Sequence, residues 1–139
     1  MGIRAAVIAA LIFLNAQAFD WEYTKRFSLQ KDELKKIYIT SKGVERLFTI
    51  RWTLFTANEL VVLSSFDEFN KQVLLKLGAN GLNAFKVELL PRARADMDTP
   101  YLYIRFISFD FESEKATFQL FLKDKRAKIL LKFEKESIN

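Results

Sequence analysis

Apolar and polar residues alternate with a period of two along most of this chain. In residues 47–56, for example, large apolar side chains occupy alternate positions: Phe48, Ile50, Trp52 and Leu54. Successive side chains of a β-strand point to opposite faces of its sheet, so this period predicts strands with one buried face. The pattern therefore indicates that sheets, rather than helices, form most of the fold.

The same criterion places strands along the whole chain after its first eighteen residues. The predicted strands are residues 19–29, 37–40, 47–56, 59–65, 72–77, 101–111, 116–123 and 127–134. One stretch differs, because Leu82, Phe85 and Leu89 recur at three- and four-residue spacing, which predicts a short helix over 82–90 that Pro91 ends. We therefore expect a mainly β domain, an antiparallel meander of about seven or eight strands forming a sandwich or a small barrel.

Residues 1–18 have the composition of a secretory signal peptide. Arg4 precedes an apolar run over residues 5–14, and Ala16 and Ala18 then form an Ala-x-Ala sequence. A membrane-spanning helix needs roughly 20 apolar residues, and Asn15 and Gln17 end this run early. We expect cleavage near Ala18, which leaves residues 19–139 as a single domain without a transmembrane helix.

The sequence contains no cysteine and no histidine. Disulfide bonds, thiolate nucleophiles, zinc fingers and histidine acid–base catalysis are therefore excluded, and we expect neither a metal nor a cofactor. An exported domain of this size without disulfides must rely on its hydrophobic core, which favours the bacterial periplasm over a small disulfide-stabilised secreted scaffold. The predicted location is thus periplasmic or secreted.

Two arginines, Arg51 and Arg105, each lie in the middle of a predicted strand. By alternation, Arg105 shares its face with four apolar or aromatic residues: Tyr101, Tyr103, Ile107 and Phe109. An arginine beside aromatic rings can bind a carboxylate or phosphate while the rings cover apolar ligand surface. We predict Arg51 and Arg105 as anion anchors and Tyr101 and Tyr103 as an apolar wall. The competing interpretation is an outward arginine paired with an acid on the neighbouring strand.

These features predict an exported, non-catalytic binding or envelope-interaction protein that meets a small amphipathic anion or another envelope protein. We expect no nucleic acid as partner of an exported chain with the modest net charge of +5, whereas contact with a membrane surface stays open. One alternative is a carboxylate-dependent hydrolase of envelope glycans, with a catalytic pair among Glu22, Asp110 and Glu112. The other is a small outer-membrane β-barrel, which the many aromatic residues suggest.

Overall fold

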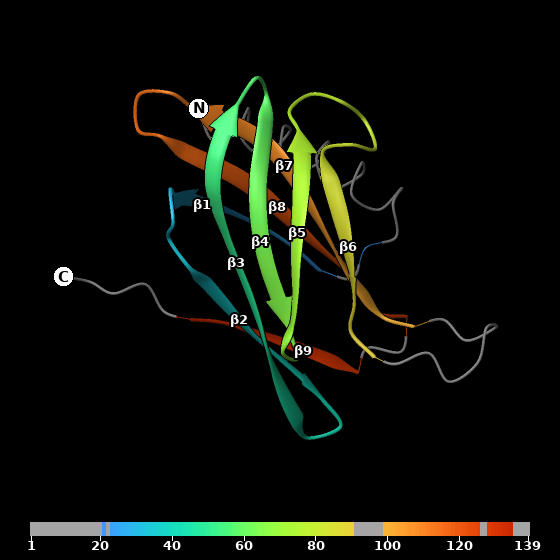
Figure 1. The fold of residues 1–139 in the computed structure, drawn as a ribbon. Helices are drawn as coiled ribbons and strands as arrows, with labels where there is room; N and C mark the ends of the chain where they lie inside the picture. The colour runs from blue at the N-terminus through green and yellow to red at the C-terminus, as the bar shows by residue number, and fades with distance from the viewer. Residues whose placement is uncertain (1–20, 22, 91–98, 126–127, 135–139) are drawn as a thin grey trace, which may run out of the picture.

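The computed structural model describes residues 21, 23–90, 99–125 and 128–134, so the predicted signal peptide lies outside the described residues. The described chain forms antiparallel strands in two sheets (Figure 1). The four-stranded sheet has the order β1 (Tyr23–Gln30), β8 (Lys115–Lys123), β7 (Tyr101–Asp110) and β6 (Ala84–Glu88). The five-stranded sheet has the order β5 (Phe69–Lys76), β4 (Glu59–Phe66), β3 (Val44–Thr56), β2 (Lys35–Ser41) and β9 (Ile129–Phe133).

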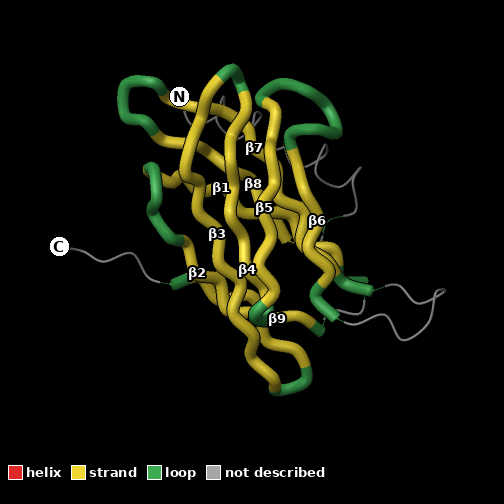
Figure 2. Tube along the Cα trace, in the orientation of Figure 1, coloured by secondary structure: helices red, strands yellow, loops and turns green. Residues whose placement is uncertain are grey.

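The mainly β, antiparallel prediction is confirmed, and of its two forms the sandwich fits. The predicted strand count is too low, because the described residues form nine strands. The helix predicted for residues 82–90 is wrong: Figure 2 shows strand and loop there and no helix in the described chain. Phe85, Val87 and Leu89 face the core at alternate positions, whereas Leu82 is exposed in the preceding turn and only mimics a helical spacing.

Three hairpins of the five-stranded sheet turn through two residues each, between β2 and β3, β3 and β4, and β4 and β5. Both residues of each turn have a positive φ: Lys42 (51°) and Gly43 (76°), Ala57 (51°) and Asn58 (63°), Asp67 (51°) and Glu68 (70°). Two positive φ angles are typical of type I′ turns, whose twist matches that of the flanking strands. The turn predicted at residues 57–58 is confirmed.

The hydrophobic core lies between the two sheets and draws on both. Phe48 of β3, Phe106 of β7 and Phe118 of β8 are fully buried there. Trp52 of β3 crosses the core, and its Nε1 donates a hydrogen bond of 2.8 Å to the carbonyl oxygen of Leu29 in β1. One continuous core thus joins the sheets without a disulfide.

A β-bulge interrupts β3 between Trp52 and Leu54. The extra residue reverses which alternate positions face the core, so Leu54 is 50% exposed while Phe55 packs against the core. The sequence prediction that Leu54 shares the buried face of Trp52 is therefore wrong. Strict alternation fails here because a bulge places two residues opposite one on the partner strand.

Candidate functional site

Three of the four predicted site residues lie together on one side of β7. Tyr101, Tyr103 and Arg105 occupy alternate positions, and the intervening Leu102 and Ile104 are fully buried in the core. Because successive side chains of a strand point to opposite faces, the two tyrosines and the arginine lie on the outer face of the four-stranded sheet. This face points away from the interior of the sandwich.

A second β-bulge limits this group to three residues of β7. It follows Phe106 and makes Ile107 the extra residue of the strand. Phe109 is consequently turned toward the core, where its ring stacks on Phe55 with centroids 4.3 Å apart. The predicted sharing of a face by Arg105 and Phe109 is wrong for this reason.

Two further aromatic residues, Trp21 and Phe121, complete the group, and neither was among the residues predicted for the site. Phe121 of β8 lies opposite Tyr103 in the register, and Trp21 packs over it with ring centroids 5.1 Å apart. Trp21 also contacts Tyr103 at 5.9 Å and Tyr101 at 6.0 Å. Under this cover Phe121 is only 8% exposed, although it lies on the outer face. The sequence feature that could have indicated a covered outer face at Phe121 is the run 120–122, which is apolar on both faces of its strand.

Two cations lie against these rings. The guanidinium carbon of Arg105 is 5.3 Å from the ring centroid of Phe121 and 5.7 Å from that of Tyr103. The Nζ of Lys86 in β6 is 4.2 Å from the centroid of Tyr101. We call this group the aromatic–cationic face; its residues are Trp21, Lys86, Tyr101, Tyr103, Arg105 and Phe121.

The positive charges of the face come from Lys86 and Arg105. Neither Lys86 nor Arg105 forms an ion pair with any acid among the described residues. The residues paired with Arg105 on the neighbouring strands are Ala84 and Gln119, neither of which is charged. The interpretation of Arg105 as half of a cross-strand ion pair therefore finds no partner in the part of the chain that the structure describes.

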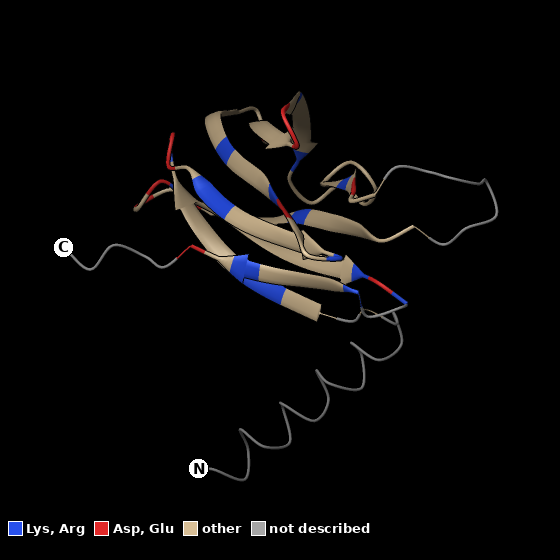
Figure 3. Cartoon of the chain, turned by 90° about the horizontal axis from the view of Figure 1, so that it is seen from below, with Lys and Arg blue, Asp and Glu red and all other residues tan. Residues whose placement is uncertain are grey.

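Acidic and basic residues are segregated along the strands (Figure 3). Every acid that the structure describes lies in a turn or within two residues of a strand end, whereas Arg105 and Arg51 lie farther inside their strands. Lys86 and Glu88 lie on the same side of the short strand β6. The ion pairs at strand ends, such as Arg46–Asp67 at 3.4 Å, are far from the centre of either sheet's outer face. The middle of the four-stranded sheet therefore presents positive charge.

The structure does not bring Arg51 to this face. Arg51 lies in β3 of the five-stranded sheet and is exposed between the buried Ile50 and Trp52. It lines a shallow depression of about 590 Å³ on the other outer side of the sandwich, with Leu63 and Gln72 across the strands. Arg51 and Arg105 therefore belong to two different surfaces.

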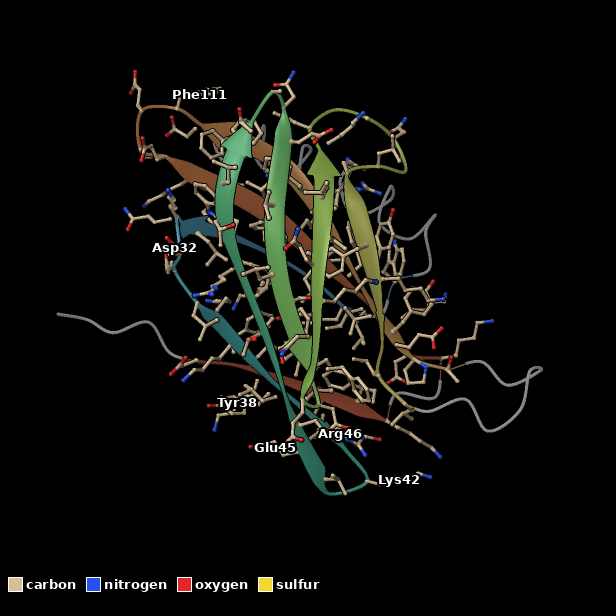
Figure 4. All side chains as sticks on the ribbon, viewed as in Figure 1. Asp32, Tyr38, Lys42, Glu45, Arg46 and Phe111 are labelled. Atoms are coloured by element: carbon tan, nitrogen blue, oxygen red, sulfur yellow. The ribbon has the colours of Figure 1, made fainter. Side chains whose placement is uncertain are left out.

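Two of the three acids considered for hydrolysis, Asp110 and Glu112, belong to one local turn. Asp110 accepts hydrogen bonds from the Ser113 hydroxyl at 2.8 Å and the Glu112 backbone amide at 3.1 Å. Figure 4 labels Phe111 in the same turn, between β7 and β8. The Ser113 hydroxyl, followed by that amide, lowers the pKa of Asp110. A general acid for glycoside cleavage needs a raised pKa instead, and Glu22 lies outside the described residues. The described turn therefore favours no catalytic pair.

Comparisons of the chain with protein-family models, curated proteins and solved structures find no match. Within the described ranges, no cluster of three or more acidic side chains has the geometry of a metal site. The same ranges contain no helix long and apolar enough to cross a membrane.

Proposed function

We propose that this chain is an exported, non-catalytic binding protein of the cell envelope whose contact surface is the aromatic–cationic face. Its partner is an extended anionic surface with apolar or ring groups beside the charges. The observation that carries the proposal is the placement of Arg105 and Lys86 against aromatic rings without an ion-paired acid among the described residues.

The physical basis is the combination of two kinds of attraction on one surface. Arg105 and Lys86 supply positive charge, which an anionic headgroup layer attracts by about 1 kcal/mol per basic side chain. Tyr101, Tyr103 and Trp21 are half-buried, so part of each remains open beside these cations. Tyrosine and tryptophan are favoured where one side is apolar and the other is wet, as at a membrane or protein interface. Together they favour a partner that offers both charge and apolar surface.

Export is the second part of the proposal and rests on the sequence of residues 1–18. Its test is the intact mass of the protein recovered from its own host by osmotic shock. We expect a mass that corresponds to a chain starting at Phe19. A chain that retains residues 1–18 in the cytosolic fraction would refute export and leave the binding surface unaffected.

Binding is tested with three probes that separate charge from apolar surface. Vesicles with anionic phosphatidylglycerol headgroups offer both, neutral phosphatidylcholine vesicles offer the apolar part, and inorganic polyphosphate offers charge alone. We expect cosedimentation with the anionic vesicles at low salt, which weakens as salt screens the charges. Equal affinity for polyphosphate would contradict a role for the rings.

The matched variants reverse charge on opposite sides of the sandwich. Arg105→Glu should weaken binding to anionic vesicles at least about fivefold, because the lost cation contributes about 1 kcal/mol. The control is Arg51→Glu, which makes the same kind of charge change on the five-stranded sheet and should alter binding by less than about twofold. An equal loss in the control would show that net charge alone drives binding, and the proposed contact surface would be wrong.

A further inference from the structure

A cleft lies on the side of the sandwich where the two sheets present the edge strands β5 and β6. The backbone amide of Lys76 donates to the carbonyl oxygen of Leu82 at 2.9 Å, which holds the edges together at one end. Beyond this hydrogen bond the described parts of β5 and β6 do not pair, and they enclose a cavity of about 450 Å³. This volume is within the range of small-ligand sites, about 300–1,000 Å³.

The walls of the cleft are mostly apolar. Phe48 is fully buried at its inner end, and Phe66 and Val87 are half-buried along it. Phe69, at the start of β5, also lines the cleft and is 79% exposed. Phe69 therefore extends the apolar wall of the cleft toward solvent.

Two polar groups lie side by side on the wall formed by β4 and β5. Ser64 and Lys71 are directly opposite each other in the register, and both share the inward side of their strands with core residues. Ser64 is only 7% exposed, whereas Lys71 is exposed and forms no ion pair with a described residue. An inward lysine on an edge strand also discourages sheet-to-sheet aggregation. Protection against aggregation would explain the charge of Lys71, but it would not require the cavity that lies beside this lysine.

We propose that this cleft binds a single-chain amphipathic anion, with its apolar tail against Phe48, Phe66 and Phe69 and its anionic head at Lys71 and Ser64. Charge complementarity orients the molecule, because the β6 wall carries two opposite charges, Lys86 and Glu88, whereas Lys71 is the one charged residue that the described parts of β4 and β5 contribute to the lining. The head is therefore placed on the β5 side. The inference does not depend on the proposed function, since the outer face and the cleft are tested with different residues.

The first test uses decanoate, octanoate and the neutral analogue decanol as probes, measured by calorimetry below their micellar concentrations. Each added methylene should tighten binding, by up to about fourfold when it is fully buried. Decanoate should bind more tightly than decanol, and the difference should shrink at high salt because Lys71 is exposed. No detectable decanoate binding at millimolar concentration would overturn the proposal.

The second test separates head from tail. Lys71→Gln should weaken decanoate three- to tenfold and leave decanol unchanged, whereas Lys132→Gln, an exposed lysine of the other edge strand β9, should change neither. Phe69→Ser should weaken both probes, with Leu130→Ser as the control, because Leu130 is 69% exposed on β9 and outside the cleft. Equal losses of decanoate and decanol in Lys71→Gln, or equal effects of Phe69→Ser and its control, would refute this site.

The third test distinguishes the cleft from the aromatic–cationic face and from another occupant. Arg105→Glu should leave decanoate affinity unchanged, so a failure of vesicle binding and a failure of decanoate binding are separate results. The alternative occupant of the cleft is an extended peptide that adds a strand to the edge of β5, which pairs with β4 alone among the described strands. Decanoate binding that survives both Lys71→Gln and Phe69→Ser would place the probe elsewhere and overturn the proposal.

Discussion

Truncating Phe121 tests whether the aromatic–cationic face is an organised cluster or a set of independent surface side chains. Phe121 is 8% exposed under Trp21, Tyr103 and Arg105. A buried phenylalanine costs about 3–5 kcal/mol when replaced by alanine, and the outer position allows Trp21 to relax into the space. We therefore expect Phe121→Ala to lower the free energy of unfolding by about 2–3 kcal/mol.

The assay is urea denaturation followed by far-ultraviolet circular dichroism. With a slope of about 2 kcal/mol per molar urea, the loss moves the midpoint by about 1 M or more. The matched control is Phe69→Ala, because Phe69 is 79% exposed and should cost no more than about 0.5 kcal/mol. A double-mutant cycle of Trp21→Ala and Phe121→Ala should give a coupling of about 0.5–1.5 kcal/mol. Equal costs for the two phenylalanines, or no coupling, would refute the cluster.

Three further perturbations address the core, the bulge and the acid-sensitive turn. Trp52→Phe should lower the free energy of unfolding by about 1–3 kcal/mol in urea denaturation, because the buried carbonyl oxygen of Leu29 loses its donor; an unchanged midpoint would contradict this. Deleting Thr53 removes the extra residue of the β3 bulge, and simple alternation from Trp52 then keeps Leu54 outside and Phe55 in the core, so the cost should stay below about 2 kcal/mol; a loss as large as that of a core truncation, about 3–5 kcal/mol, would be the contrary result. The Ser113 hydroxyl lowers the pKa of Asp110, so this interaction stabilises the fold above the ordinary carboxyl pKa and is lost as pH falls below it. Ser113→Ala should raise the pKa of Asp110 in a carboxyl NMR titration, and no upward movement would contradict the assigned cause.

Local alternation was sufficient to predict most strands and the position of the turn at residues 57–58. It failed at the two bulges, where one extra residue reverses which alternate positions face the core. Leu54 and Phe109 were placed on the wrong faces, because the pattern of apolar residues does not reveal a bulge. It also failed at residues 82–90, where a turn residue and a strand together imitate a helical spacing. These errors share one cause, since hydrogen bonding between strands, and not the strand's own sequence, sets the local phase.

The candidate site was predictable only in the part that one strand carries. Tyr101, Tyr103 and Arg105 were found because they are alternate residues of β7. Trp21 and Phe121 contact these residues from other segments of the chain. The pairing of β7 with β8 cannot be predicted from the residues of either strand alone. Arg51 resembled Arg105 in sequence, and only the assignment of β3 and β7 to different sheets separates the two.

The most direct measurement of the central claim is the quenching of tryptophan fluorescence by vesicles of brominated anionic lipid. The chain has two tryptophans, of which Trp21 lies on the aromatic–cationic face and Trp52 is 3% exposed in the core. We expect quenching on binding that disappears in Trp21→Phe while the Trp52 emission persists. Vesicle binding that leaves the Trp21 emission unquenched would contradict the assignment of this face as the contact surface.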